Sequence, residues 1–352
     1  MHDPSQSREM VVIVDWLGRG GIAHTTEAWV RERAVRGQAT SVVTRAGREL
    51  DRLVPDRIGA GARGGALIGH AEVVRAAIRA VRERTKCTVV LQGSVLPQLE
   101  LRLARSARGG GNPVVLVAHE STVTRRSPGK TRSYVRLVRS ADIVIAHSSF
   151  VAEELFRRTG RRDIEVVPLP LPLGLLDLLG TAPSVLAPSD VPVALHFGNL
   201  HRDYKGSATV QGLAERTVPG WRFALVGKGA PARATGAETV GRFLDPAELV
   251  ATVAGSDATL LPYVRASQSA AVVLAQALGS PVIASAVGGI PEQIEHGVTG
   301  LLVAPDAPVE AWKDALLALS DPAERDRLAT AAAASVRRAH ERFVTRIVEL
   351  LP

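Results

Sequence analysis

The stretch LLPYVRASQSAAVVLAQALGSPVIASAVGGIPEQIEHGVTGLLV, residues Leu260–Val303, is the most informative part of this sequence. It predicts a short apolar strand, a polar loop Tyr263–Ser269, a helix of small apolar residues and, after a Gly-Ser-Pro turn, a second strand. A helix that begins near Ser269 directs its unpaired backbone N–H groups and the positive end of its dipole towards that loop. Such a helix start is suited to binding a phosphate. The stretch therefore predicts an anion site on a parallel α/β domain.

Apolar, β-branched runs alternate with helical patterns on both sides of a proline-rich segment. In the first half the expected strands are Val11–Asp15, Thr40–Thr44, Cys87–Gln92, Pro113–Ala118 and Asp142–Ala146. In the second half they are Val193–Phe197, Arg222–Val226, Ala258–Leu261, Pro281–Ala284 and Leu301–Val303. This alternation is typical of βαβ units that form a parallel sheet. We expect an α/β protein with two Rossmann-like domains, at residues 1–180 and 181–335, and a C-terminal helix, within residues 336–352, that packs back on the first domain.

Composition limits the class of protein. With 352 residues and 46% apolar content, the chain is large enough to bury two ordinary cores. The single Cys87 excludes an internal disulfide and a cysteine-based zinc cluster. The polar first ten residues and the lack of a long apolar run predict a soluble, cytoplasmic protein without a leader or a membrane span.

Positive charge is concentrated in the first half of the chain. Residues 1–180 contain 28 Lys and Arg against 18 Asp and Glu, while residues 181–352 contain 15 against 17. The segment Arg125–Arg139 is especially basic. This distribution favours an acidic partner, either an anionic surface at the inner face of a membrane or an acidic acceptor, and a solvated arginine-rich surface explains it equally well. Nucleic acid is not expected as a partner, because aromatic residues make up only 4% and no binding module is recognisable.

Four segments, taken in order, resemble a GT-B fold glycosyltransferase of family 4, the glycosyl transferases group 1. They are RGGIAHTTEAWVRERAVRGQATSVVTR, FGNLHRDYKG, WRFALVGKG and ALGSPVIASAVGGIPEQIEHGVTGLLV. The resemblance covers essentially the whole length and implies two domains that face one another across a cleft. It also implies transfer of a hexosyl-type sugar from a UDP- or GDP-sugar to a glycan, lipid-linked or small-molecule acceptor, as in polysaccharide biosynthesis. Retention of the anomeric configuration and the absence of a metal or other cofactor are implied as well, and the sequence contains no Asp-x-Asp to hold a cation on a diphosphate.

Without a metal, cationic side chains and helix starts must stabilise the charge that grows on the leaving diphosphate. Lys205 with Gly206 matches the pyrophosphate-binding Lys-Gly of the family. Arg202, three residues before Lys205, is the expected partner cation, as in many relatives with a similar loop, although Asn199 stands where some relatives have an arginine. We assign Lys205 and Arg202 to catalysis and to donor binding, with a solvated loop position as the alternative for each.

The other donor-binding residues implied by the resemblance lie in loops. They are Gly20, Gly21, Gly227, Arg242, Phe243, Ser267, Gln268, Ser269 and Glu292. The glycines let the backbone approach a ligand closely, and Arg242 or Phe243 is suited to stack on the base. The residues Ser267–Ala270 resemble the Ser-Gln-Ser loop variant of the family. A dehydrogenase is disfavoured, because the first glycine loop lacks the third glycine of a dinucleotide fingerprint.

His119 is the remaining catalytic candidate. It follows the expected strand Pro113–Ala118, at the carboxyl end where ligands bind in such sheets. The family often has a histidine here, with a role in positioning the donor sugar. A hydrogen-bonded histidine that only lines the cleft is the alternative.

The chain departs from the family at two positions. Many members carry two Glu separated by seven residues, and these positions correspond to Ala266 and Leu274. No carboxylate is available there, and Glu292 is the candidate replacement. A catalytically weak or inactive nucleotide-binding relative is therefore the alternative function, and a nucleotide-sugar epimerase of the same fold is another.

Overall fold

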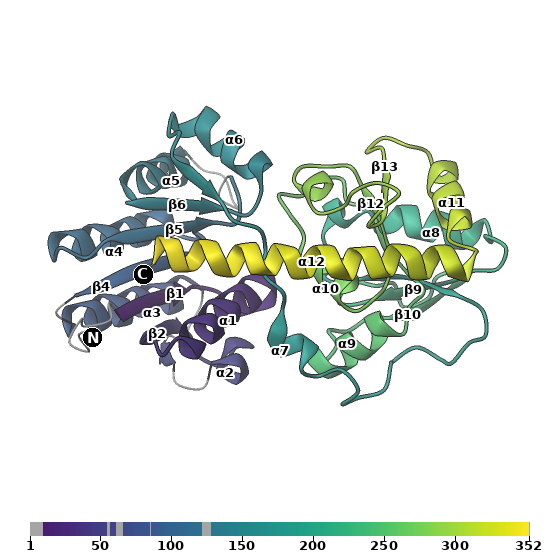
Figure 1. Cartoon of the computed structure of the whole chain (residues 1–352), viewed down its shortest axis with the longest axis horizontal. Coiled ribbons are helices and arrows are strands. Elements are labelled where there is room, and N and C mark those ends of the chain that lie inside the picture. Colours follow the sequence, from purple (N-terminus) through teal and green to yellow (C-terminus); the bar gives the residue numbers. More distant parts are fainter. Residues whose placement is uncertain (1–9, 55–56, 61–65, 85, 122–127, 352) are drawn as a thin grey trace, which may run out of the picture. The chain divides into compact units, whose positions relative to one another are not determined.

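The computed structural model describes residues 10–54, 57–60, 66–84, 86–121 and 128–351. The chain divides into two compact units, Met1–Pro170 with Arg342–Pro352, and Leu171–Glu341 (Figure 1). Each unit contains a parallel sheet with helices on both faces. The prediction of two parallel α/β domains is therefore confirmed.

In the described part of the first unit, seven parallel strands form one sheet in the order β3-β2-β1-β4-β5-β6-β7. The strands are β1 (Met10–Asp15), β2 (Thr40–Arg45), β3 (Ile58–Ala60), β4 (Cys87–Gln92), β5 (Val114–Ala118), β6 (Ile143–Ala146) and β7 (Ile164–Val166). The helices are α1 (Gly20–Val35), α2 (Leu50–Leu53), α3 (Ala66–Arg82), α4 (Pro97–Gly109), α5 (Pro128–Ser140) and α6 (Ser149–Thr159). Helices α3 to α6 cover one face, and α1 with the end of α12 (Pro322–Leu350) covers the other.

The central strands β1, β4, β5 and β6 of the first sheet are mostly apolar because both faces of the sheet are buried there. Along β1, Val12 packs towards α3 to α6 and Ile13 packs towards α1 and α12. On that second face the rings of Trp29 and Phe343 meet edge to face, with 6.1 Å between centroids. Both rings are fully buried, so the last turns of α12 belong to the core of the first unit.

In the described part of the second unit, six parallel strands form one sheet in the order β10-β9-β8-β11-β12-β13. The strands are β8 (Val193–Phe197), β9 (Arg222–Val226), β10 (Ala237–Val240), β11 (Ala258–Leu261), β12 (Val282–Ser285) and β13 (Leu301–Val303). The helices are α7 (Leu173–Leu176), α8 (Ser207–Glu215), α9 (Pro246–Ala254), α10 (Ala270–Ala277) and α11 (Val309–Ala318), with the short helices η1 (Asp203–Lys205) and η2 (Ile290–Glu292). Helices α7, α9 and α10 cover one face, and α8, α11 and the first part of α12 cover the other.

Three of the described strands were not predicted from the sequence, and all three lie at sheet edges. These are β3 and β7 in the first sheet and β10 in the second. Each is three or four residues long and only partly buried. An edge strand covered on fewer sides needs no continuous apolar run, so its sequence carries little periodic signal.

The strand order reverses once in each sheet. In the first sheet the reversal lies between β1 and β4, and in the second between β8 and β11. The loops that follow such a strand pair leave towards opposite faces, and ligands of α/β sheets commonly bind between such loops at the carboxyl ends of the strands. Each unit therefore presents one favoured place for a ligand.

Candidate active site

The reversal point of the second unit brings the Lys205 loop and the Tyr263–Ser269 loop together. The first follows β8 through η1, and the second follows β11. The Nζ of Lys205 donates a hydrogen bond to the Oη of Tyr263 at 2.8 Å and lies 4.0 Å from the centroid of its ring. The anion-binding lysine expected from the sequence therefore lies at the carboxyl edge, where an α/β sheet binds ligands.

Gly206 allows the lysine loop to approach the neighbouring strand. Its φ is +68°, and a Cβ at this position would lie 1.8 Å from the carbonyl oxygen of Pro262. Only glycine fits both this conformation and this contact. The glycine after Lys205 is therefore required by the packing of the two loops.

His196, in the middle of the second sheet, supports the same loop from below. Its Nδ1 donates to the carbonyl of Leu260 at 2.8 Å, so its Nε2 accepts from the hydroxyl of Ser207 at 3.1 Å. The pKa of His196 falls to about 4, because burial, together with the charge of Lys205, outweighs the hydrogen bond to Leu260. The imidazole is neutral at pH 7 and ties the start of α8 to β11.

The Ser-Gln-Ser loop is fastened to the segment that follows β12. Ser269 is the N-cap of α10, where its Oγ accepts from the N–H of Val272 at 3.3 Å. Its own N–H donates to Oε1 of Gln293 at 2.8 Å, and Nε2 of Gln293 returns a bond to the carbonyl of Ser269 at 3.1 Å. The carbonyl of Ser267 accepts from the N–H of Gly289 at 3.0 Å. The serine loop is thus held by backbone contacts, and Ser269 uses its own N–H within the chain.

A second close approach of backbones lies at the ends of β8 and β9. A Cβ on Gly227, whose φ is +133°, would lie 1.9 Å from the carbonyl oxygen of Gly198. Leu200 donates its N–H to the carbonyl of Lys228 at 2.8 Å. The expected glycine turn is therefore present, and the missing side chain of Gly227 allows the loop after β9 to pack against the loop after β8.

Arg242 and Phe243 follow β10 and differ in their surroundings. The guanidinium of Arg242 pairs with both carboxylate oxygens of Glu248 at 2.6 and 2.8 Å. The pKa of Glu248 falls to about 2 because of this pair and of the N–H of Asp245. Phe243 is 59% exposed, with Nζ of Lys228 5.8 Å from its ring centroid. Of the two stacking candidates, Phe243 is the one whose face is open to a base.

Arg202 and Glu292 are both exposed on the second unit. The guanidinium of Arg202 has neither a hydrogen bond nor an ion pair with any described residue. Glu292 closes η2. Leu274, which corresponds to one glutamate position of the family, is 4% exposed in the apolar core beneath the sheet. The helix at that position faces the core, and Ala266 on the loop supplies no polar group.

The first unit carries the glycine loop at the carboxyl end of β1. The buried carboxylate of Asp15 accepts from the N–H of Gly18 at 2.8 Å and from the hydroxyl of Thr26 at 3.0 Å. Burial raises the pKa of Asp15, against these hydrogen bonds. Gly20 donates its N–H to Oε2 of Glu49 at 2.7 Å. The loop is held by two carboxylates of the chain itself.

Glu49 also meets a histidine of α1. Its Oε1 lies 3.1 Å from Nε2 of His24. Burial raises the pKa of Glu49, but the contacts with His24 and with the N–H of Gly20 outweigh it and leave the pKa lowered. Gly20 was expected to meet the donor with its backbone, and in this structure its N–H is engaged by Glu49.

His119 lies at the carboxyl end of β5, between the last residue of β4 and the residue that follows β6. Its Nε2 donates to Oε1 of Gln92 at 3.0 Å, and its ring centroid lies 4.9 Å from that of His147. Burial, and then the nearby His147, hold the pKa of His119 well below 6.5. His147 donates from Nδ1 to the carbonyl of Val167 at 2.8 Å, and its pKa falls to about 4 because of burial. Both rings are neutral at pH 7 and act by hydrogen bonding.

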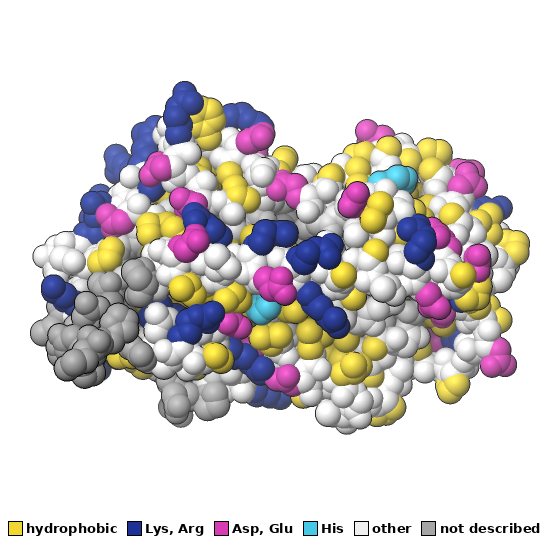
Figure 2. Space-filling model, in the orientation of Figure 1, with side chains coloured by type: hydrophobic (Ala, Val, Ile, Leu, Met, Phe, Trp, Pro, Cys, Tyr) yellow, Lys and Arg dark blue, Asp and Glu magenta, His cyan; other side chains and the backbone are white. Residues whose placement is uncertain are grey.

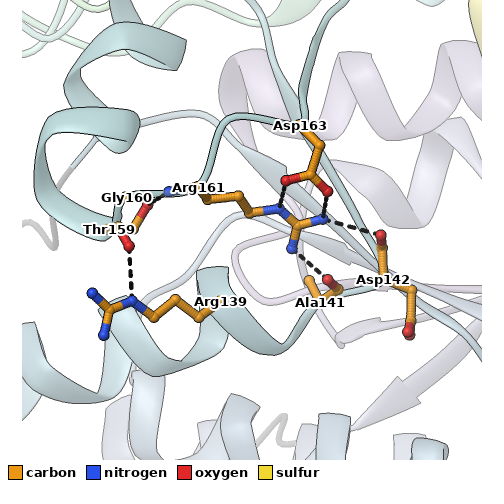
Figure 3. A pocket seen from close by; sticks show the side chains of 7 residues that line it. All are labelled: Arg139, Ala141, Asp142, Thr159, Gly160, Arg161 and Asp163. Atoms are coloured by element: carbon orange, nitrogen blue, oxygen red, sulfur yellow. Dashed lines mark hydrogen bonds and ion pairs between the residues drawn. The ribbon is translucent and has the colours of Figure 1, made fainter.

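A hollow of about 470 Å³ lies at the opposite edge of the first sheet, near the amino ends of β6 and β7. Figure 3 shows Arg161 across it, paired with both oxygens of Asp163 at 3.1 and 2.9 Å. The same guanidinium donates to the carbonyls of Val138, at 2.8 Å, and of Asp142, at 3.0 Å. Since its donors are used by the chain, we interpret Arg161 as a structural clamp that joins β6 to β7.

Basic side chains gather on the first unit over α5 and α6, as Figure 2 shows for one face. Of the basic segment, Arg132 and Arg136 are exposed on α5. Arg139 donates to the carbonyl of Thr159 at 2.8 Å. Arg125 and Arg126 lie outside the described residues. Contact with an anionic membrane stays a prediction.

Within the described ranges, no group of three or more His, Cys, Asp or Glu side chains is arranged to bind a metal ion. The same residues include no helix with the length and apolar character needed to cross a bilayer. Several residues that contact the candidate loops were not singled out from the sequence, namely Glu49, His147, His196 and Gln293, and Tyr263 was noted only as the start of the polar loop. They carry no local motif, and only their contacts reveal them.

Comparison with known proteins agrees with this fold. Residues 191–321 match the family described as Glycosyl transferases group 1. D-inositol 3-phosphate glycosyltransferase of Corynebacterium glutamicum (strain R) is 45% identical over 92 residues, which are 25% of this chain and 22% of that protein. The enzyme of the same name from Kribbella flavida is 37% identical over 105 residues, 29% of this chain and 24% of that protein. The matched segments thus span less than a quarter of the length of these relatives.

Solved structures match over nearly the whole chain at low identity. Anabaena HepE in complex with UDP-glucose is 18% identical with a TM-score of 0.73, covering 97% of this chain and 98% of that one. Sucrose-phosphate synthase from Thermosynechococcus elongatus is 20% identical, with the same TM-score and the same coverage. At such identities the likeness establishes the fold, which is that of GT-B glycosyltransferases.

Proposed function

We propose that the protein is a glycosyltransferase that moves a hexosyl-type sugar from a nucleoside-diphosphate sugar to a hydroxyl-bearing acceptor, with retention and without a metal. The observation that carries this proposal is the position of Lys205 at the reversal point of the second sheet, in a segment that matches Glycosyl transferases group 1. Anabaena HepE, which shares the fold, was solved in complex with UDP-glucose, so UDP-glucose is the first donor to test.

Charge on the leaving diphosphate is the main chemical demand of such a transfer. The bond between the anomeric carbon and the diphosphate oxygen breaks, and negative charge grows on that oxygen. Lys205 and Arg202 offer cations without carboxylate partners among the described residues, which leaves their charge available for an anion. The start of α10 adds the positive end of a helix dipole. These groups perform without a metal the task that a bound cation performs in other transferases.

The nucleoside and the sugar need separate contacts. We assign the exposed ring of Phe243 to the base, on which it stacks, and Gly227 to the turn beneath the nucleotide. Glu292, Ser267 and Gln268 complete the proposed donor contacts of the second unit.

In the first unit we assign His119 to a sugar or acceptor hydroxyl. Its pKa lies far below 7, so it is neutral and orients a hydroxyl by a hydrogen bond. The N–H of Gly20 already donates to Glu49. Gly21 lies in the same first turn of α1, and we assign its backbone N–H to an anion of the donor. The acceptor is part of the proposal only as a class, a molecule with a free hydroxyl.

The test is the substitution Lys205→Ala, compared with Lys313→Ala on α11 as a matched loss of charge in the same unit. We expect Lys205→Ala to weaken UDP binding at least about tenfold, because a charge-assisted contact is lost. Transfer or hydrolysis of UDP-glucose should fall about 100-fold or more. Lys313→Ala should leave both unchanged. Equal activity of Lys205→Ala and the wild type would refute the assigned site.

A nucleotide-binding protein without turnover is the second candidate. It is favoured by the buried, apolar Leu274 and by Ala266, which leave both glutamate positions of the family without a carboxylate. The pure protein would then bind UDP or GDP yet neither transfer nor hydrolyse any sugar nucleotide in a donor screen. Turnover with any donor excludes it.

A further inference from the structure

Two cations of the second unit lie against one aromatic ring. The Nζ of Lys205 lies 5.6 Å from the ring centroid of Tyr204, and Cζ of Arg265 lies 5.5 Å from it. Lys205 is also 4.0 Å from the ring centroid of Tyr263. Such distances are those of cation–π contacts. The two tyrosines therefore gather one cation from the loop after β8 and another from the loop after β11.

Neither cation is neutralised by a carboxylate. Among the described residues, the guanidinium of Arg265 has no hydrogen bond or ion pair, and the only hydrogen-bond partner of the Lys205 amine is the hydroxyl of Tyr263. Arg265 is exposed, whereas Tyr263 is 2% exposed. An aromatic face orients a cation without cancelling its charge, so both cations keep their charge for an external anion. An arginine needed only for solubility has no reason to lie on a ring beside a second cation.

Backbone contacts make the two loops one unit. The N–H of Val264 donates to the carbonyl of Tyr204 at 2.8 Å. Gly206 lies against the carbonyl of Pro262, so closely that no Cβ fits. The two loops that carry the cations are therefore fixed relative to each other by packed backbone, which lowers the entropy lost when both cations bind one ligand.

We propose that Arg265 is a second cationic ligand of the diphosphate held by Lys205, with Tyr204 and Tyr263 as positioning residues for the two cations. The inference rests on the proposed function, which supplies a diphosphate as the anion. Arg265 then provides a second positive charge beside Lys205, in addition to the exposed Arg202 of the loop after β8. Arginine suits this role because its planar donors bind two phosphate oxygens at once.

The first experiment measures UDP and UMP binding by titration calorimetry for Arg265→Gln. We expect UDP affinity to fall at least tenfold and UMP affinity to fall clearly less, because the second phosphate carries the added charge. Arg216→Gln, which changes another exposed arginine of the same unit, should leave both affinities unchanged. Unchanged UDP affinity in Arg265→Gln overturns the proposal, and an equal loss for both nucleotides does so as well.

The second experiment separates the ring of Tyr263 from its hydroxyl. Tyr263→Phe keeps the cation–π face and should retain most of the preference for UDP over UMP. Tyr263→Leu removes the face and should lose most of that preference. A purely structural role would lower the melting temperature in Tyr263→Leu while the UDP to UMP ratio stayed constant, which would refute positioning.

The outcomes for this inference and for the proposed function differ. If the wild type binds UDP or GDP and Arg265→Gln binds it equally, only the inference fails. If the wild type binds neither nucleotide but binds inorganic pyrophosphate in an Arg265-dependent way, the cation pair stands and the nucleotide-sugar function fails. If it binds none of the three, both fail.

Discussion

Replacing Gly206 with alanine tests the contact on which the anion site depends. The added Cβ would lie 1.8 Å from the carbonyl oxygen of Pro262, whereas real Cβ atoms essentially never come closer than 3.0 Å to such a neighbour. The obstacle is backbone, so the lysine loop or the end of β11 must move. The φ of +68° costs an L residue about 1–2 kcal/mol, and the overpacking adds about 1–3 kcal/mol. We therefore expect Gly206→Ala to lose about 2–5 kcal/mol of stability.

A matched control isolates the contact from the backbone strain. Gly220 has a φ of +76°, and a Cβ there would meet nothing within 4 Å. Gly220→Ala should thus cost only the strain, about 1–2 kcal/mol. Urea unfolding followed by circular dichroism and tryptophan fluorescence measures both variants. The excess loss in Gly206→Ala is the cost of the clash with Pro262.

The same substitution should harm function beyond its effect on stability. A displacement of Lys205 by about 1 Å is enough to lower turnover about 100-fold. UDP affinity at a temperature where the variant is folded should fall as well, whereas Gly220→Ala should keep it. If the two alanine variants lose equal stability and both bind UDP normally, the close approach of the two loops is refuted.

Three further outcomes are expected. Burial lowers the pKa of His196 from 6.5 to about 4, so the unfolded chain binds the proton more tightly. The contribution of His196 to the free energy of unfolding is complete above pH 6.5 and should fall by about 3 kcal/mol as pH drops to 4. In pH-dependent urea unfolding, His196→Gln should therefore reduce the slope over this range and leave the shares of His119 and His147. Phe343→Ala should cost about 3–5 kcal/mol in the same assay, because the ring is fully buried against Trp29. Phe243→Ala should leave stability within about 0.5 kcal/mol of the wild type, since the ring is exposed, yet weaken UDP more than pyrophosphate in calorimetry.

Much of the fold was predictable because it follows from local sequence. A strand buried on both faces must be apolar at nearly every position, so runs such as Val11–Asp15 and Val193–Phe197 can be predicted as strands from the sequence alone. The edge strand Ala237–Val240 does not, since it is only partly buried and carries Glu238 and Thr239. This strand forms because it pairs with β9, and no local sequence pattern predicts that pairing.

Part of the candidate site was predictable for a similar reason. Lys205 with Gly206 forms a short motif, and the sequence around Ser269 predicts the start of a helix. The partners of these residues were not predictable. Tyr263 lies 58 positions from Lys205, and Gln293 lies 24 positions from Ser269. Nothing in the spacing of such residues requires them to meet.

The order of strand, loop, helix and strand within Leu260–Val303 follows from local sequence, because periodicity, helix capping and glycine turns act over a few residues. The groups that face the loop within that stretch depend on tertiary contacts. The strand order places β8 beside β11, and this pairing sets Lys205 on the ring of Tyr263 and leaves Arg265 over Tyr204. The physical reason is that an anion site needs charges gathered from separate loops, and their distance in space is set by sheet order and backbone packing.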